Sequence, residues 1–145
     1  MSNNPLIIKK LRAGGERITP IRMALVEILS KSHKPLTPQE LLRALTKQGL
    51  GANKTTVYRQ LGTLERYNII HEVHFTDRTK RYELINESGH HHHLVCLECQ
   101  RIEDVAFPTD LEQQEKTIWK KNKFKVLQHS LEFFGLCQSC QIKKK

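Results

Sequence analysis

The chain has 145 residues, of which 38% are hydrophobic, and its formal net charge is +9. This length allows one domain or two small ones, each with a compact core. The longest early apolar run, Leu6-Ile7-Ile8, is too short for a transmembrane span or a signal peptide. We therefore expect a cytoplasmic protein with no membrane partner, and the basic balance favours a polyanionic partner.

The first fifty residues contain three helix-start patterns. A short basic amphipathic helix is predicted over 4–13, ended by the glycines at 14 and 15. Thr19 is the predicted cap of a second helix, with Pro20 at its first position. The segment 37–40 reads Thr-Pro-Gln-Glu, a capping box that opens a third helix.

A fourth helix is predicted from about Asn53 to Tyr67, with Val57, Leu61 and Leu64 on its core-facing side. The opposite face has no acidic residue and combines arginines with small and hydroxyl side chains: Thr55, Arg59, Gly62 and Arg66, flanked by Thr56 and Tyr58. For an isolated helix, the simplest interpretation of such a face is a solvated basic surface. The helix before it and the hairpin after it favour nucleic-acid recognition instead.

That hairpin is predicted from two strand-like runs, 69–75 and 79–85, around the turn Asp77-Arg78. Helices followed directly by a recognition-type helix and a hairpin are the order of a winged helix-turn-helix domain. A polar break at 87–89 then marks the boundary between predicted domains 1–86 and 87–145.

The second half alternates strands and helices, so we expect an α+β protein overall. After a histidine run come a short strand at 102–105 and a capping-box pattern at 109–112, which opens a helix reaching about Lys121. A last strand is predicted over 125–134, with apolar residues and one histidine sharing a face: Leu127, His129, Leu131 and Phe133.

Four cysteines form two C-x-x-C turns at opposite ends of this second half: Cys96, Cys99, Cys137 and Cys140. In a reducing compartment, paired turns of this kind favour metal binding over disulfides. They match a closed tetrahedral Zn²⁺ site, which stabilises the fold and leaves no open position for chemistry. The alternatives are a pair of free thiol turns or, for a lone C-x-x-C, a thioredoxin-like redox motif.

The histidine run covers residues 90–93 and leads into an apolar strand-like segment. Side chains alternate along a strand, so His90 and His92 point one way while His91 and His93 point the other. Histidines with nearby carboxylates suit exchangeable Fe(II), Mn(II), Zn(II) or Ni(II). His129 is equally compatible with a core histidine bonded to backbone.

The sequence resembles the ferric uptake regulator family over nearly its whole length. The motifs that carry the resemblance are the segments 17–22, 55–59, 81–84, 90–99 and 129–131 and the final C-x-x-C turn. The resemblance implies a homodimeric, metal-dependent transcriptional repressor that binds palindromic A/T-rich operators. It also implies an N-terminal winged helix followed by a small C-terminal α/β dimerisation domain that binds metal, with a four-cysteine zinc site. It does not imply an enzyme, and no H-E-x-x-H or deaminase-type zinc pattern is present.

The resemblance also implies roles in DNA binding. Tyr58 is expected to pack on thymine methyls in the major groove, Arg59 to contact the backbone or base edges, and Arg17 to reach the minor groove. Thr55 and Thr56 belong to the same recognition face. Arg22 is expected to contact phosphates, so that its loss weakens binding to all DNA and flattens the salt dependence.

The family's regulatory metal site resembles a set formed here by Glu83, His91, His93 and Asp104, with Glu103 as the alternative carboxylate. A second site would use His90, His92, Glu112 and His129.

One departure concerns the histidine that iron-type members supply before the third helix, where this chain has Pro35. The possible replacements are His33, His71 and His74. We expect structural Zn²⁺ and a regulatory Fe²⁺, Zn²⁺ or Mn²⁺. Iron or zinc sensing is the first interpretation, peroxide or manganese sensing the alternative, and a DNA-binding protein with only structural metal a further one.

Overall fold

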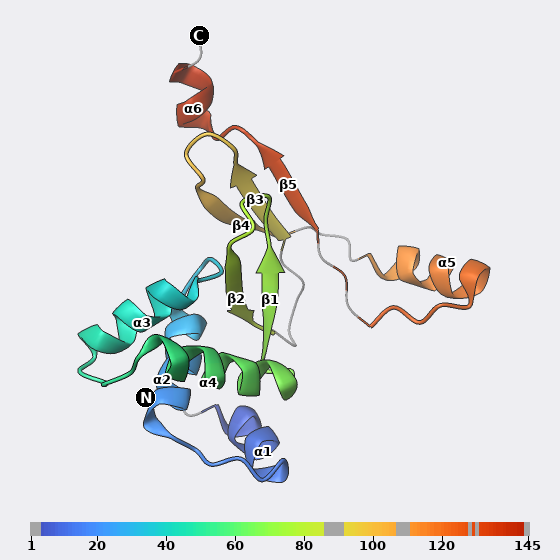
Figure 1. The fold of residues 1–145 in the computed structure, drawn as a ribbon. Coiled ribbons are helices and arrows are strands. Elements are labelled where there is room, and N and C mark those ends of the chain that lie inside the picture. Colours follow the sequence, from blue (N-terminus) through green and yellow to red (C-terminus); the bar gives the residue numbers. More distant parts are fainter. Residues whose placement is uncertain (1–3, 86–91, 107–110, 128, 130, 144–145) are drawn as a thin grey trace. The chain divides into compact units, whose positions relative to one another are not determined.

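The computed structural model describes residues 4–85, 92–106, 111–127, 129 and 131–143 (Figure 1). The chain divides into two compact units, Met1–Ile85 and Asn86–Lys145. Among the described residues, none of the helices combines the length and the apolar character that a bilayer span requires.

The N-terminal unit begins with four helices: α1 (Pro5–Ala13), α2 (Pro20–Lys31), α3 (Pro38–Lys47) and α4 (Lys54–Arg66). Each starts where its sequence pattern predicts. Thr19 accepts a hydrogen bond from the backbone of Arg22 to cap α2, and Asn53 accepts one from Thr56 to cap α4. At α3, Thr37 and Glu40 form a reciprocal capping box, which satisfies backbone donors at both ends of the first turn.

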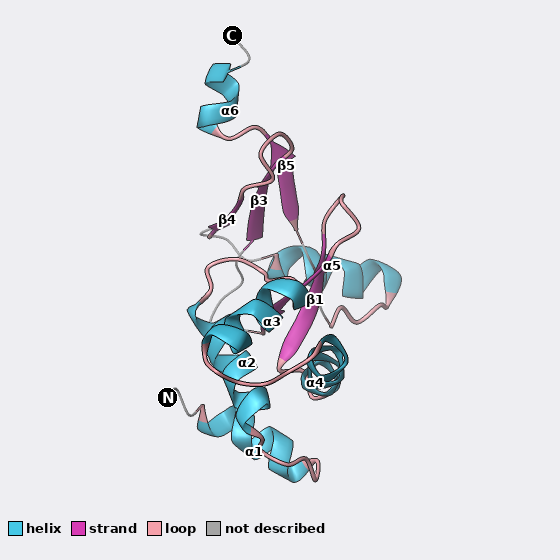
Figure 2. Ribbon diagram, turned by 60° about the vertical axis from the view of Figure 1, so that its left-hand side comes forward, coloured by secondary structure: helices cyan, strands magenta, loops and turns pink. Residues whose placement is uncertain are grey.

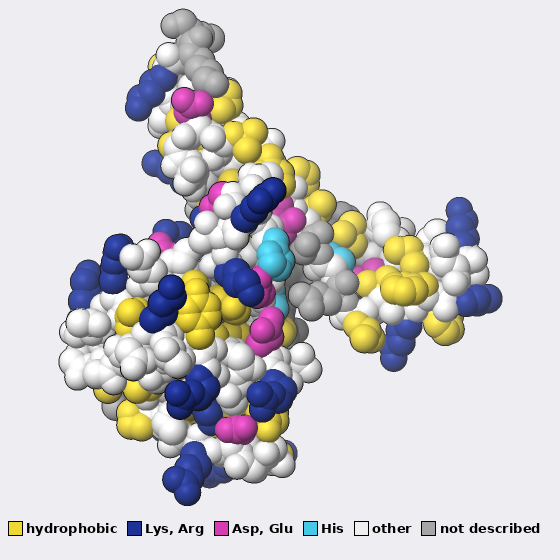
Figure 3. Space-filling model, viewed as in Figure 1, with side chains coloured by type: hydrophobic (Ala, Val, Ile, Leu, Met, Phe, Trp, Pro, Cys, Tyr) yellow, Lys and Arg dark blue, Asp and Glu magenta, His cyan; other side chains and the backbone are white. Residues whose placement is uncertain are grey.

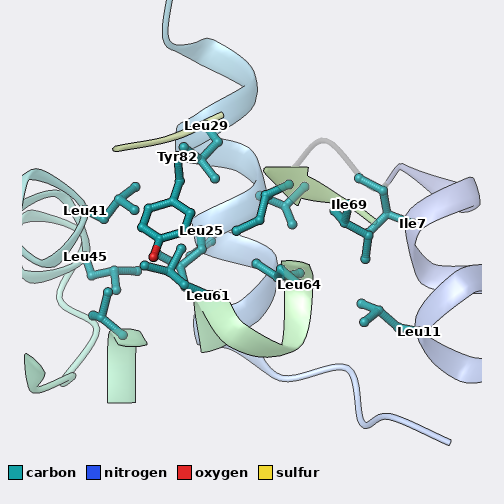
Figure 4. Packing of buried hydrophobic residues seen from close by; sticks show 14 residues of the cluster. Ile7, Leu11, Leu25, Leu29, Leu41, Leu45, Leu61, Leu64, Ile69 and Tyr82 are labelled. Atoms are coloured by element: carbon teal, nitrogen blue, oxygen red, sulfur yellow. The ribbon is translucent and has the colours of Figure 1, made fainter. Parts of the chain in front are cut away.

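These helices enclose a single hydrophobic cluster (Figure 4). Leu11 of α1, Leu25 of α2, Leu41 of α3 and Leu61 of α4 are all 0 to 1% exposed. Fully burying a leucine contributes roughly 1.5–3 kcal/mol. Because each helix contributes such side chains, the cluster fixes their mutual packing.

A two-stranded antiparallel hairpin follows α4 and consists of β1 (Ile70–His74) and β2 (Lys80–Leu84). Tyr82 of β2 also exchanges backbone hydrogen bonds with Leu36, before α3, at 2.8 and 2.9 Å. The hairpin packs against α2, α3 and α4. The N-terminal unit is therefore the winged helix-turn-helix domain that the sequence predicts.

At the tip of this wing, the Arg81 guanidinium donates to both carboxylate oxygens of Asp77 at 2.6 and 2.9 Å. This bidentate pair holds the pKa of Asp77 down to about 2. Arg81 also lies over the ring of Phe75, with 5.1 Å between its guanidinium carbon and the ring centroid. These contacts join the two sides of the wing tip.

The C-terminal unit contains a three-stranded sheet in the order β4-β3-β5 (Figure 2). Its strands are β3 (His92–Cys96), β4 (Ile102–Val105) and β5 (Glu132–Gly135). β3 pairs antiparallel with β4 and parallel with β5. Two helices, α5 (Glu112–Asn122) and α6 (Gln138–Lys143), complete the described part of the unit.

Two predictions in this unit need correction. α5 has Leu111 at its N-cap position with no side-chain cap bond, and Thr109, which the predicted capping box requires, lies outside the described residues. The last strand is also shorter than the predicted 125–134. β5 begins at Glu132, opposite His93 of β3, and Leu127 is 85% exposed. A strand needs a neighbouring backbone to bond with, which alternation in the sequence cannot supply.

Candidate DNA-binding and metal sites

α4 presents a polar, basic face to solvent. Val57, Leu61 and Leu64 are buried on its inner side, whereas Thr55 and Arg59 are exposed and Tyr58 is 42% exposed. The hydroxyl and backbone N–H of Thr56 both donate to Asn53 at the helix start, at 2.9 and 2.8 Å. Tyr58 and Arg59 are therefore presented for contact, while the Thr56 hydroxyl helps to start the helix.

Basic side chains spread widely over the N-terminal unit in the view of Figure 3. This unit has 15 Lys and Arg against 7 Asp and Glu, whereas the C-terminal unit has 9 against 8. Almost all of the net positive charge therefore belongs to the unit that contains α4. Such a distribution attracts a polyanion to that unit in particular.

Arg17 and Arg22, both predicted to contact DNA, have different surroundings. Arg17 is exposed in the loop between α1 and α2. Arg22 is only 5% exposed, and its guanidinium donates to Gln60 at 2.8 Å, to Glu16 at 3.2 Å and to the carbonyl oxygen of Arg17. The expected phosphate contact of Arg22 does not fit this geometry. Its charge is used inside the unit, because a buried guanidinium must be paired.

Glu83 lies on β2 directly opposite His71 of β1. The distance from His71 Nε2 to Glu83 Oε1 is 2.8 Å. His74 points to the other side of the hairpin and pairs with Glu72 at 3.0 Å. Among the replacements considered for the missing family histidine, His71 is thus the one paired with Glu83.

The segment before α3 explains the departure at Pro35. Pro35 is fully buried, next to the Leu36 backbone that pairs with Tyr82. His33, two residues earlier, is exposed. The residue at position 35 is therefore buried in the N-terminal unit, and a proline ring supplies no metal ligand.

In the C-terminal unit, His93 is 4% exposed and lies opposite Asp104 of β4. Its Nε2 is 3.7 Å from Asp104 Oδ1. The alternative carboxylate, Glu103, lies 3.5 Å from Arg101. The structure therefore brings together His93 and Asp104 of the predicted regulatory set, while His91 lies outside the described residues.

His92 lies on the other side of β3, where its ring centroid is 6.0 Å from that of His129. The carboxylate that reaches His129 is that of Glu115, 2.6 Å from Nδ1. The predicted carboxylate, Glu112, instead lies 3.9 Å from Lys116 one turn along α5. Sequence reasoning missed Glu115, although Glu115 and Glu112 are three residues apart and share a helix face. His90 lies outside the described residues.

The four cysteines are gathered as predicted, with their sulfur atoms all within 4.8 Å of one another. In tetrahedral Zn²⁺ coordination with bonds of about 2.3 Å, sulfurs are separated by about 3.8 Å. The distance between Cys99 Sγ and Cys137 Sγ is 3.7 Å. The geometry therefore fits a structural Zn²⁺ held by all four thiolates.

Hydrogen bonds make these thiols unequal. The backbone N–H of Cys137 donates to Cys96 at 3.4 Å and is the main cause that lowers the pKa of Cys96 to about 6. The neighbouring Cys137 thiol raises the pKa of Cys140 to about 12. Four thiols this close do not all ionise without a cation, so the cluster suits a dication.

Comparison with known proteins gives a consistent result. The sequence model of the "Ferric uptake regulator family" matches residues 13–134. The chain is 32% identical over 136 residues to the peroxide-responsive repressor PerR of Staphylococcus saprophyticus, which covers 94% of this chain and 90% of that protein.

Among solved structures, the Helicobacter pylori ferric uptake regulator matches with a TM-score of 0.75 and 28% identity, over 94% of this chain and 93% of that one. Its structure is described as revealing three functional metal-binding sites. PerR from Streptococcus pyogenes matches with a TM-score of 0.52 and 24% identity, over 93% of this chain and 90% of that one, which shows a shared fold alone.

Proposed function

Because this chain belongs to the ferric uptake regulator family of transcriptional regulators, we propose that it is a metal-dependent, peroxide-responsive repressor that binds operator DNA as a homodimer. The exposed face of α4 in a winged helix-turn-helix domain supports DNA binding. The peroxide response is supported by one observation above the others, namely the 32% identity to a peroxide-responsive repressor over nearly the whole chain.

In this proposal, α4 enters the major groove. Tyr58 offers an apolar ring that suits thymine methyl groups, and Arg59 offers donors for phosphates or base edges. Arg17 is exposed on the loop before α2 and reaches the narrow minor groove of an A/T-rich flank. Thr55 completes the recognition face.

The regulatory metal is proposed to bind His93 and Asp104, with His91 and Glu83 as further ligands. The pairing of His93 with Asp104 supports the first two, and the strand alternation supports His91. Because His71 is paired with Glu83, it is the replacement we propose for the histidine that Pro35 displaces. Imidazole and carboxylate ligands suit Fe(II) and Mn(II) as well as Zn(II). When bound, Fe(II) supplies the reducing electron for peroxide chemistry.

We propose that the C-terminal unit mediates dimerisation. No residue of α5 is buried, and large apolar side chains are exposed on α5, on the segment that follows it and on β5: Ile118, Trp119, Phe124, Leu127, Phe133 and Phe134. Apolar side chains of α5 are visible in Figure 3. Exposed apolar surface of this kind marks an interaction surface, and a second copy of the chain would bury it.

The test is operator binding by protein reconstituted with one metal at a time. Fluorescence anisotropy on a palindromic A/T-rich duplex would be measured with Fe(II), Mn(II) or Zn(II), before and after hydrogen peroxide. We expect the Fe(II) form to lose about tenfold or more in affinity after peroxide, while the Mn(II) form keeps its affinity. The Mn(II) form is the control for damage to the zinc thiolates.

Equal loss in the Fe(II) and Mn(II) forms would contradict a response through the regulatory metal. His93→Ala is expected to abolish the metal dependence of operator binding. His74→Ala removes a histidine from the same hairpin as His71, and it is expected to leave the metal concentration at half-maximal operator binding unchanged. Operator binding that needs no added metal would favour a protein with structural metal only.

A further inference from the structure

Arg22 is a buried cation whose partners come from two different parts of the N-terminal unit. Two of its acceptors, Glu16 and the carbonyl oxygen of Arg17, belong to the loop between α1 and α2. The third, Gln60, belongs to α4 and accepts from Arg22 Nε at 2.8 Å. Arg22 itself lies in the first turn of α2. One guanidinium thus links the loop that carries Arg17 with the helix that carries Tyr58 and Arg59.

A second tie joins the same loop to the end of α4. Tyr67, at the C-cap of α4, donates from its hydroxyl to the carbonyl oxygen of Gly14 at 3.0 Å. A Cβ on Gly14 would lie 2.1 Å from Tyr67 Cε1, so any larger residue would displace the Tyr67 ring. Gly15 adopts a φ of +77°, a left-handed backbone conformation that favours glycine.

We infer that Arg22 and Gln60 are positioning residues that set the spacing between the minor-groove arginine and the recognition helix. This inference rests on the proposed function, in which Arg17 and α4 contact adjacent grooves. The Tyr67–Gly14 bond holds the start of the loop against the end of α4. Arg22 bonds both to Gln60 and to the carbonyl oxygen of Arg17, and so holds Arg17 at a fixed distance from α4. Arg22 and Gln60 need not touch DNA to affect how it is read.

The chemistry of Arg22 suits this role. A guanidinium has five donors in a rigid planar fork and is always charged, so it can hold several acceptors in fixed directions. A lysine in its place would keep the charge but could not hold the same planar arrangement. Because Arg22 is buried, its three bonds are protected from competition with water.

The inference is tested first on the free protein. Gln60→Met has a similar length but no acceptor, whereas Gln60→Glu keeps an acceptor for Arg22. We expect hydrogen exchange of the backbone amides in the loop 14–18 to become several-fold faster in Gln60→Met and to stay near wild type in Gln60→Glu. Unchanged exchange in Gln60→Met, or equal acceleration in both variants, would overturn the positioning role.

The second test is a double-mutant cycle on DNA with Gln60→Met and Arg17→Ala. In the wild-type background, Arg17→Ala is expected to weaken operator binding by about tenfold. In the Gln60→Met background, Arg17→Ala is expected to weaken operator binding by about twofold or less, because the loop no longer presents Arg17 correctly. If the losses of operator affinity caused by Gln60→Met and Arg17→Ala simply add in the double variant, the inference is overturned. Gln114→Ala, an exposed glutamine of α5, is the control and is expected to leave the cost of Arg17→Ala unchanged.

The two tests separate this inference from the proposed function. If the wild-type protein binds no operator with any metal, the proposed function fails, but the exchange measurement still decides whether Gln60 holds the loop. If operator binding is normal and exchange does not respond to Gln60→Met, the proposed function stands and the positioning role fails.

Discussion

The N-terminal unit has a hydrophobic cluster of 14 buried residues drawn from its helices and wing. In the described part of the C-terminal unit, the only hydrophobic residues that are buried are Val95, Cys96 and Cys140, and two of these are zinc-site cysteines. The first unit therefore folds by removing apolar surface from water. In the described part of the second unit, the side chains enclose no core of comparable size.

The polar residues of the two units differ in the same way. In the N-terminal unit, the buried Arg22 is satisfied by Glu16 and Gln60 within the unit. Among the described residues of the C-terminal unit, the buried polar ones are His92 and His93, and imidazole is a side chain that can bind metals. The buried polar residues therefore hold segments together by hydrogen bonds in one unit and are candidate metal ligands in the other.

Removal of zinc is the largest perturbation that separates the two units. Structural Zn²⁺ contributes about 10 kcal/mol or more to the folding of small domains, so Cys140→Ser is expected to unfold the C-terminal unit and spare the winged helix. Limited proteolysis and zinc analysis of the full chain would check this. Cleavage is expected after residue 85 only, and chelation followed by zinc readdition should reproduce the effect reversibly in wild type. Uniform resistance to proteolysis after zinc loss would contradict the comparison.

A cavity in the cluster tests the opposite dependence. Leu25 is 0% exposed, and Leu25→Ala is expected to lower the free energy of unfolding of the N-terminal unit by about 3 kcal/mol, through lost burial and the cavity left behind. Leu6→Ala makes the same chemical change in the same unit at a side chain that is 59% exposed, and it should lower stability by only about 0.5 kcal/mol. Urea unfolding monitored by circular dichroism would measure both. Similar losses in the two variants would refute the division into core and surface.

The helix caps provide a smaller test. Thr37 closes a reciprocal capping box with Glu40, so Thr37→Ala should cost about 1 kcal/mol in the N-terminal unit. Thr46→Ala, near the exposed end of the same helix, is the matched control. It should lower stability by less, since Thr46 accepts no hydrogen bond from the backbone N–H groups of the first turn. A loss in Thr37→Ala no larger than in Thr46→Ala would show that packing alone holds α3.

The wing gives the smallest expected effect. The Arg81 guanidinium lowers the pKa of Asp77 to about 2, so this carboxylate stabilises the folded state above its unfolded pKa of about 4. That contribution is lost as the pH falls toward 2. Because the pair is partly exposed, solvent limits it to less than about 1 kcal/mol. The stability difference between wild type and Asp77→Asn should narrow between pH 5 and pH 2.5 in urea unfolding. A difference that does not change with pH would exclude the ionised pair as its source.

Local patterns predicted much of the fold. Thr19 and Thr37 cap helices as the sequence predicts, and α4 begins next to Asn53 as predicted, because a cap depends only on residues two or three positions away. The C-x-x-C turns likewise predicted the thiol cluster, since few other arrangements satisfy four cysteines in two such turns. The resemblance to the family covered nearly the whole chain, so it gave expectations also for segments without such local patterns.

What the sequence determined by itself is therefore most of the elements, the buried faces of the N-terminal helices and the residue types able to bind zinc, whereas α6 was not predicted. The tertiary structure alone decided which groups meet across elements. It placed Arg22 inside the N-terminal unit instead of on its surface, and it brought His71 to Glu83 and Glu115 to His129. The physical reason is that caps and alternation act over a few residues of chain, whereas a hydrogen bond between distant segments depends on how helices and strands pack.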